Sequence, residues 1–266
     1  MKLLKEFNLT ESQLRKILNG RKYKPQIIKE AITNNELEFG VIADTHLCSK
    51  FEKLDELHTF YAICKKIGIK HIVHAGDIIA GQGIYTGQEN EIHTFGADSQ
   101  VRYVVENYPK IEGIKTHFIT GNHCLSYFKK SGVDVGEKIS AQREDMNYLG
   151  QYQGNIEIGG VKIRLLHPDG GGAYAISYKG QKIAEQIPSG QKPHLLVLGH
   201  YHTSVYFFYR NMHILYAGAF EGQSSFLLRK GINPSIGGWT VRVRIAKDKR
   251  KSIVAIVPSW IPFFGR

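Results

Sequence analysis

The stretch that decides the fold is LEFGVIADTH, residues 37–46. Its first five residues alternate between apolar side chains and polar or small ones, and its last three are Asp44, Thr45 and His46. Alternation with a period of two is typical of a strand that buries one face. The sequence therefore predicts a strand that runs directly into a carboxylate and an imidazole.

The same arrangement, an apolar run followed by polar side chains of the kind that bind metals, recurs along the chain. The other four instances are Ile72-Val73 before Gly76-Asp77, His117-Phe118-Ile119 before Gly121-Asn122-His123, a hairpin over residues 156–166 before His167, and residues 195–198 before Gly199-His200-Tyr201-His202. In open α/β sheets, functional sites form beyond the carboxyl ends of the strands. Five such ends predict one shared site.

Helical patterns separate these strands and indicate an α/β fold. Apolar residues at spacings of three and four predict amphipathic helices over residues 51–67 and 101–108, and a further helix is expected near 174–186. More strands are expected at residues 205–208, 214–216, 241–245 and 253–257.

The residue types of the strand ends suit a metal centre. Imidazole and carboxylate without thiolate favour Mn, Fe or Zn over the soft metals. Two cations about 3.5–4 Å apart can share one carboxylate and bind both the attacking and the leaving oxygen of a phosphate. We expect two divalent metal ions, with Mn favoured and Fe, Zn, Ni or Mg as alternatives. Gly76 and Gly121 would let the backbone approach the metals closely.

These five blocks, taken together and in order, resemble the calcineurin-like metallophosphoesterase family, whose pattern is D-x-H, G-D, G-N-H, a lone His and G-H-x-H. The resemblance covers residues 37 to about 220. It implies a four-layer α-β-β-α sandwich with two mixed β-sheets. It also implies a phosphoesterase, a hydrolase that acts on phosphoric ester bonds.

The resemblance further implies a role for each residue. Asp44, His46 and His202 would hold one metal, Asn122, His167 and His200 the other, and Asp77 would bridge the two. Water activated by both cations would attack phosphorus in line. His123, which is not a ligand, would stabilise the transition state or protonate the leaving alkoxide. For any single histidine a hydrogen-bonded interior position is the alternative, but seven residues in family order favour ligands.

The sequence departs from the family at two positions. Many relatives carry a second Asp in G-D-x-x-D where this chain has Ala80, and an acid often follows G-N-H where this chain has Cys124. Both departures weaken the resemblance to the Ser/Thr phosphatase branch. We expect Cys124 to be a small packed residue beside the ligands, and His71 and His74 to be core or supporting residues.

Basic residues concentrate at both ends of the chain. Residues 1–36 hold eight Lys and Arg against four Glu, and residues 229–266 hold nine against one Asp, within a net charge of +11. Clustered basic charge suits a polyanion such as nucleic acid. The alternative is a solvated face that keeps the protein soluble.

Residues 1–36 differ in pattern from the rest, and we expect them to form a separate helical segment ahead of a catalytic domain over residues 37–266. Thr10 and Gln13 predict a capping box that opens one helix, and Pro25 fits the first turn of a second helix through Ile32. Two helices across a basic turn resemble half of a helix-turn-helix unit. The alternative is a helical pair that packs on the catalytic domain.

Three regions are candidates for substrate contact. The polar loop of residues 80–97, with Tyr85 and His93, follows the strand that carries Asp77 and is expected to lie over the site. Asp169 and Gly171, after His167, could present backbone N–H groups to a phosphate, or could simply form a tight turn. Arg242 and Arg244 share the outer face of a strand and could track a phosphate backbone, or could belong to an exposed hairpin tip.

The sequence also bears on location. No apolar run approaches the roughly 18–20 residues needed to span a bilayer, so no membrane partner is expected. The beginning of the chain turns polar too early for a secretory signal. The three cysteines, Cys48, Cys64 and Cys124, have no paired spacing. A cytoplasmic protein is the resulting expectation.

Taken together, these patterns predict a two-metal phosphodiesterase that acts on nucleic acid, similar in kind to the DNA-repair exonucleases of the family. One alternative is a phosphatase or phosphodiesterase for a small nucleotide or a phosphoprotein. Another is a nucleic-acid-binding module with a vestigial metal site.

Overall fold

The first sheet is built around β2 (Glu36–Ile42), the strand that leads to Asp44. In the computed structural model, which describes residues 25–30, 35–246 and 252–263, β2 lies between a parallel and an antiparallel neighbour. The order across this sheet is β12 (Ile253–Pro262), β11 (Gly237–Ile245), β2, β3 (His71–His74), β4 (Lys115–Thr120) and β5 (Met146–Gln151). β2 to β5 run in parallel, so their carboxyl ends meet at one edge.

The second sheet also has six strands. Their order is β1 (Gln26–Ile28), β6 (Gln153–Ile158), β7 (Val161–Leu166), β8 (Leu195–Leu198), β10 (Met212–Ala217) and β9 (Ser204–Tyr209). β6 and β7 form the expected antiparallel hairpin, whereas β7, β8 and β10 run in parallel. The carboxyl ends of β7 and β8 therefore deliver His167 and His200 at one edge.

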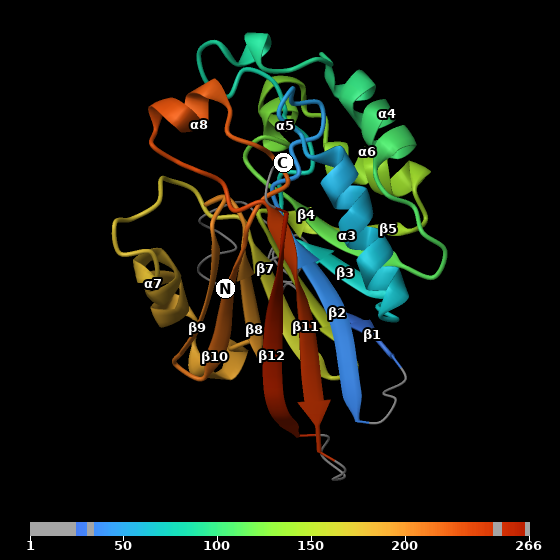
Figure 1. The fold of residues 1–266 in the computed structure, drawn as a ribbon, viewed down its shortest axis with the longest axis vertical. Helices are drawn as coiled ribbons and strands as arrows, with labels where there is room; N and C mark the ends of the chain where they lie inside the picture. Colours follow the sequence, from blue (N-terminus) through green and yellow to red (C-terminus); the bar gives the residue numbers. More distant parts are fainter. Residues whose placement is uncertain (1–24, 31–34, 247–251, 264–266) are drawn as a thin grey trace, which may run out of the picture.

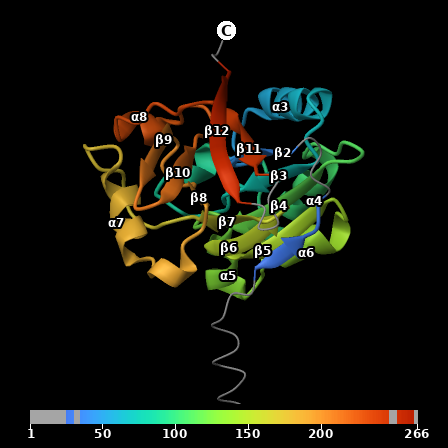
Figure 2. The ribbon, with the colours of Figure 1, turned by 90° about the horizontal axis from the view of Figure 1, so that it is seen from below.

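Helices cover the outer faces of both sheets (Figures 1 and 2). α3 (Leu54–Lys66), α4 (Ala97–Asn107) and α6 (Val135–Gln142) lie over the first sheet, and α7 (Tyr178–Gln186) lies over the second. Shorter helices interrupt the loops: η1 (Gln88–Asn90), α5 (Leu125–Ser131), η2 (Ser189–Gln191) and α8 (Ser225–Arg229).

Three apolar cores correspond to the three interfaces between these layers. Leu37, Phe39 and Val41 of β2 point into the core between the two sheets, as their alternation predicts. Ile42, on the opposite face, packs with the helices over the first sheet. A third core lies between the second sheet and α7. The predicted α-β-β-α sandwich with two mixed sheets is confirmed.

The N-terminal expectation is only partly covered by the structure. The first expected helix and the basic turn lie outside the described residues. The second helix, expected from Pro25 through Ile32, is wrong over Gln26–Ile28, which form β1 instead. β1 pairs in parallel with β6, from Gln26 opposite Ile156 to Ile28 opposite Ile158, and this ladder outweighs a weak local helix preference. None of the helices in the described residues is long and apolar enough to cross a membrane.

The packing between the sheets generates a stability prediction. Phe39 is fully buried in the inter-sheet core, so Phe39→Ala should lower the free energy of unfolding by about 3–5 kcal/mol. Phe208→Ala is the matched control, because Phe208 is 58% exposed on β9, and it should change that free energy by less than about 0.5 kcal/mol. Urea unfolding followed by circular dichroism measures both. Equal effects of the two substitutions would contradict the assignment of the core.

Candidate metal centre

The predicted ligands come together at the carboxyl ends of strands from both sheets. Asp44 and His46 follow β2, Asp77 follows β3, Asn122 follows β4, His167 follows β7, and His200 and His202 follow β8. In three groups of residues, the donor atoms of each group lie within 4.8 Å of one another. These groups are Asp44–His46–His202, His46–Asp77–His123 and Asp77–His167–His200. The fold therefore brings together residues as far apart in sequence as Asp44 and His202, as the pattern of strand ends predicts.

Asp44 provides the clearest sign of a cation site. Its Oδ1 atom is buried and has no hydrogen-bond partner. That atom lies 3.6 Å from Nε2 of His46 and 3.5 Å from Nε2 of His202. The other oxygen, Oδ2, accepts a 2.9 Å hydrogen bond from the backbone N–H of His200. An unpartnered buried carboxylate oxygen is costly unless a charged group faces it.

The spacing of these donors fits one cation. Nitrogen and oxygen ligands lie about 2.0–2.2 Å from a zinc-like ion, so two ligands of one ion are separated by roughly 3–3.5 Å. The Nε2 atoms of His46 and His202 are 3.2 Å apart, and both lie close to this distance from Asp44 Oδ1. Asp44, His46 and His202 thus fit the predicted first ligand set.

Asp77 lies between this set and a second one. Its Oδ2 atom is 3.0 Å from Nε2 of His167, which is also 3.1 Å from Oδ1 of Asn122. Its Oδ1 atom accepts backbone N–H groups from His123 at 2.9 Å and Cys124 at 3.4 Å. Asp77 belongs to two of the three donor groups, as a bridging carboxylate should.

Two glycines are needed for this close packing. A Cβ atom on Gly121 would lie 2.5 Å from Asp77 Oδ1 and 2.6 Å from His167 Nε2. One on Gly76 would lie 2.4 Å from His167 Nδ1, and Gly76 has φ +100°. No side chain fits at either place, because real Cβ contacts below 3.0 Å essentially do not occur. At both glycines the backbone therefore lies directly against the side chains of His167 or Asp77.

Most of the candidate ligands also adopt an unusual backbone conformation. Five of the seven have positive φ angles, which are Asp44 (51°), His46 (42°), Asp77 (53°), His200 (77°) and His202 (52°). Residues other than glycine rarely adopt this left-handed region, and each such residue costs of order 1–3 kcal/mol. Strain of this kind clusters at functional sites, where the surrounding structure holds it in place.

Carboxylates and imidazoles of the cluster shift one another's pKa values toward their charged forms. Burial opposes the charge of Asp44, but His202, His46 and His167 hold its pKa well below the usual range. Burial likewise opposes charge at His46 and His167, yet nearby carboxylates raise the pKa of each to about 9. Protons on these imidazoles therefore balance the carboxylates, and a bound cation would displace them.

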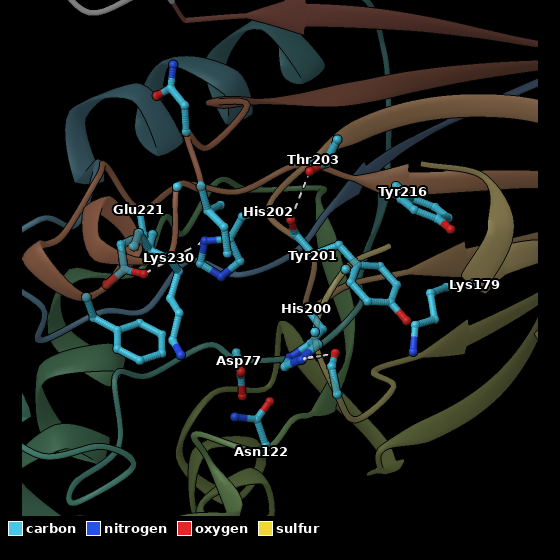
Figure 3. A pocket seen from close by; sticks show the side chains of 18 of the residues that line it. Asp77, Asn122, Lys179, His200, Tyr201, His202, Thr203, Tyr216, Glu221 and Lys230 are labelled. Carbon is cyan, nitrogen blue, oxygen red and sulfur yellow. Dashed lines mark hydrogen bonds and ion pairs between the residues drawn. The ribbon is translucent and has the colours of Figure 1, made fainter. Parts of the chain in front are cut away.

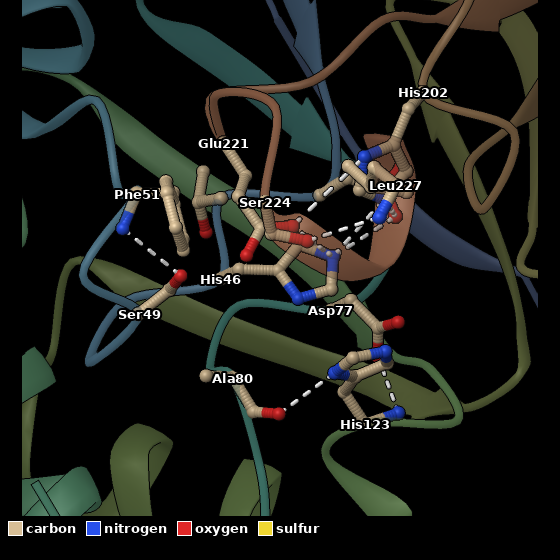
Figure 4. Close-up of polar contacts among 12 residues, drawn as sticks. His46, Ser49, Phe51, Asp77, Ala80, His123, His202, Glu221, Ser224 and Leu227 are labelled. Carbon is tan, nitrogen blue, oxygen red and sulfur yellow. Dashed lines mark hydrogen bonds and ion pairs between the residues drawn. The ribbon is translucent and has the colours of Figure 1, made fainter. Parts of the chain in front are cut away.

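His123 lies beside the cluster with a fixed tautomer (Figure 4). Its Nδ1–H donates a 2.7 Å hydrogen bond to the backbone carbonyl of Ala80, which leaves Nε2 with a free lone pair. Burial, and then the nearby His46, lower the pKa of His123 to about 3. His123 also lines the pocket above the ligands, so a neutral imidazole faces the place where a substrate would bind.

The supporting residues lie where they were expected. His74 is buried, and its Nε2–H donates to Thr45 Oγ1 at 3.2 Å while its Nδ1 accepts from the backbone N–H of Gly76 at 3.3 Å. Burial lowers its pKa to about 3, so it remains neutral. His71 pairs with His117 at 3.1 Å, away from the ligands. Cys124 is buried, and burial raises the pKa of its thiol to about 12.

The predicted substrate contacts divide into two groups. Tyr85, Asp169 and Gly171 line the pocket above the ligands. His93 does not line it, because its ring lies 3.4 Å from Glu52 and packs against Tyr103.

Arg242 and Arg244 also lie outside the pocket. They form ion pairs with Glu38 and Glu36 near the start of β2, whereas the ligands follow its other end. Alternation along a strand indicates which face a residue occupies, but it does not indicate which end of the sheet the site will use.

Glu221 is a site residue that sequence reasoning missed. Its buried carboxylate lies 3.9 Å from Nε2 of His46 and 4.0 Å from Nδ1 of His202 (Figures 3 and 4). It follows β10 by four residues, at the same edge as the candidate ligands. The strand-end rule could have found it, but no paired motif marks it in the sequence.

The four layers and the cluster of carboxylates and imidazoles at the strand ends together define the metallophosphoesterase fold. The model of the calcineurin-like phosphoesterase superfamily domain matches residues 37–229, more than half of the chain. The chain therefore belongs to this superfamily.

Curated relatives and solved structures show more distant similarity. The DNA polymerase II small subunit of Methanothermobacter thermautotrophicus is 24% identical over 203 residues, which are 64% of this chain and 42% of that protein. The corresponding subunit of Archaeoglobus fulgidus is 24% identical over 205 residues, 65% of this chain and 42% of that protein. The chain thus spans less than half the length of these relatives. A solved archaeal phosphodiesterase matches with a TM-score of 0.48 and 13% identity, over 85% of this chain and 100% of the other.

The position of Glu221 generates a metal-binding prediction. Glu221→Gln removes a negative charge beside His46 and His202, and it should weaken Mn²⁺ binding by about 10- to 100-fold, the effect typical of residues around a metal ligand. Equilibrium dialysis with metal analysis measures the affinity. Glu106→Gln, an exposed carboxylate on α4, is the matched control and should bind Mn²⁺ like the unmodified chain. Unchanged affinity in Glu221→Gln would show that this carboxylate does not act on the metal site.

Proposed function

We propose that this chain is a metal-dependent phosphodiesterase that uses two divalent metal ions to hydrolyse phosphodiester bonds in nucleic acid. One observation carries the proposal: seven carboxylate, amide and imidazole side chains from five strand ends, with Asp77 among them, gather at the floor of an open pocket. The donor set favours Mn²⁺, with Fe, Zn, Ni and Mg as alternatives. The arrangement matches the requirement for two cations that share one carboxylate.

The proposed ligand sets are those that the family resemblance implies, and the distances between the donor atoms support them. Asp44, His46 and His202 would hold one cation, and Asn122, His167 and His200 the other. Asp77 would contact both. When bound, the two cations would supply electrostatic stabilisation of the phosphate and lower the pKa of the attacking water.

The chain's own groups position the reacting atoms. The backbone N–H groups of His123 and His200 hold Asp77 and Asp44 in fixed orientations. The hydrogen bond from His123 to Ala80 directs Nε2 toward the pocket. A bound phosphate would favour a proton on that nitrogen through its negative charge. His123 could then stabilise the transition state or donate the proton to the leaving oxygen.

The shape and charge of the pocket favour a polymer diester over a small monoester. The pocket has a volume of about 1090 Å³, slightly more than the roughly 300–1,000 Å³ of typical small-ligand sites. Lysines line it on two sides of the metal ligands, so groups on both sides of a phosphate can be accommodated. The net charge of +11 and the similarity to DNA polymerase small subunits also favour nucleic acid.

A nucleic-acid-binding module with a vestigial metal site is the second candidate. The similarity to polymerase small subunits favours it, because those proteins are named as subunits of a DNA polymerase. The complete set of seven ligand-type residues argues against it, since a site without a function would not need five strained backbone positions. Hydrolysis by the isolated chain separates the two candidates.

The first test compares the metal-loaded chain with Asp77→Asn. Single- and double-stranded DNA, RNA, a synthetic diester and a synthetic monoester are each offered with Mn²⁺. We expect metal-dependent cleavage of the polymers and the diester, and a loss of at least about 100-fold in Asp77→Asn, because the shared carboxylate charge is removed. Asp98→Asn, an exposed carboxylate on α4, is the matched control and should retain full activity.

The outcomes of this test are distinct. Activity confined to the monoester would overturn the nuclease proposal and favour a small phosphorylated metabolite or a phosphoprotein. Binding of DNA without cleavage under any metal would favour the vestigial-site candidate. Cleavage that survives in Asp77→Asn would indicate a contaminating nuclease.

A further inference from the structure

The pocket above the metal ligands has two walls built from separate parts of the chain (Figure 3). One wall consists of residues 169–174, Ile176 and Lys179, from the loop after His167 and the start of α7, together with Tyr201. The other consists of residues 224–233, which include α8, together with Tyr85 from the loop of residues 80–97. Both walls carry the same two kinds of side chain, lysine and aromatic residues.

Each wall places one lysine at the pocket. Lys179 lies on the side of Tyr201 and Lys230 on the side of Glu221, with Asp77 and Asn122 between them (Figure 3). Among the described residues, neither ammonium group has a carboxylate within 4.0 Å. Two lysine ammonium groups without acidic partners in the described part of the chain lie on opposite sides of the proposed reaction centre. They are suited to bind the two phosphates on either side of the phosphate that is cleaved.

Each wall also carries aromatic side chains, which are exposed on the first wall and half-buried on the second. Tyr174 is fully exposed at the rim of the first wall, and Ile176 beside it is 53% exposed. On the second wall, Phe226 stacks on Tyr85 with ring centres 4.1 Å apart, and the Lys230 ammonium lies 5.7 Å from the Phe226 ring centre. Exposed apolar groups gathered at a pocket mark a binding surface. Aromatic rings beside lysines are the combination that binds unpaired nucleobases and their phosphates.

We propose that the two walls bind the nucleotides on either side of the scissile phosphate in single-stranded nucleic acid. Bases would stack on Tyr174 and on the Phe226–Tyr85 pair, while Lys179 and Lys230 bind the adjacent phosphates. A duplex fits this surface poorly, because its base faces are already stacked on one another and cannot reach the aromatic rings. This inference rests on the proposed phosphodiesterase function, because that function defines which phosphate is central.

Equilibrium binding tests the proposal without interference from cleavage. The full chain carrying Asp77→Asn, with Mn²⁺ present, is titrated into a fluorescein-labelled oligothymidylate of about 12 nucleotides and into a duplex of the same length, and anisotropy is recorded. We expect tighter binding to the single strand. Tyr174→Ala and Phe226→Ala should each weaken that binding by about 5- to 150-fold, the range for loss of one stacking residue.

The lysines are tested through salt dependence. Lys179→Ala and Lys230→Ala should each lower the slope of log affinity against log salt concentration by about 0.7, because one phosphate contact is lost. Two residues on α7 that do not line the pocket provide matched controls, Tyr178→Ala for the aromatic substitutions and Lys182→Ala for the lysines. Both controls should bind like the parent protein. Thermal unfolding of every variant verifies that it is folded.

Two results would overturn the inference: equal or tighter binding of the duplex, or full binding by folded Tyr174→Ala and Phe226→Ala variants. Cleavage of a synthetic diester by the unmodified chain tests the proposed function separately. If the diester is cleaved but the wall substitutions have no effect on binding, the function stands and the single-strand site fails. If no diester is cleaved but the binding pattern holds, the site stands as a single-strand binding surface and the enzymatic proposal fails.

Discussion

Two buried carboxylates, Asp44 and Asp77, impose the constraint on which the rest of the site depends. Both follow the carboxyl ends of central strands, β2 and β3, and are almost completely buried. No lysine or arginine among the described residues pairs with either. Ionised groups in such surroundings require compensation by opposite charge and by hydrogen-bond donors. His46, His167 and His202, with the backbone N–H groups of three other residues, provide it. The ends of both sheets are arranged to satisfy these two anions.

That arrangement requires backbone strain, and the two sheets hold it in place. The five candidate ligands with positive φ angles all follow a strand that is buried on both faces or nearly so, which leaves their backbones little freedom to relax. The inter-sheet core ties β2 and β3 to β7 and β8, so ligands from different sheets keep their separation. Rigid scaffolding of this kind is what a site with geometric requirements needs.

The floor of the site could be predicted from the sequence, but its walls only in part: Tyr85 and Asp169 were expected to contact substrate and do line the pocket. Short local patterns mark Asp44, Asp77 and Asn122, because each follows a buried strand whose end must reach the common edge. Tyr174, Lys179 and Lys230 lie in loops and short helices whose position depends on packing between distant segments, and no local pattern reports that packing. β1 was missed for the same reason, because its partner β6 lies more than a hundred residues away. Arg242 and Arg244 were assigned the correct face of a strand but lie toward the opposite end of the sheet from the ligands.

The large sequence separation between the candidate ligands also affects how the protein folds. The set begins at Asp44 and closes at His202, and it draws on both sheets. Contacts between residues so far apart form late, because the intervening chain must first lose its loop entropy. The candidate metal centre can therefore assemble only after the two sheets have docked. A cation would then stabilise the native state by mass action without acting as a nucleus for folding. Binding of metal would therefore indicate that both sheets have already folded and docked.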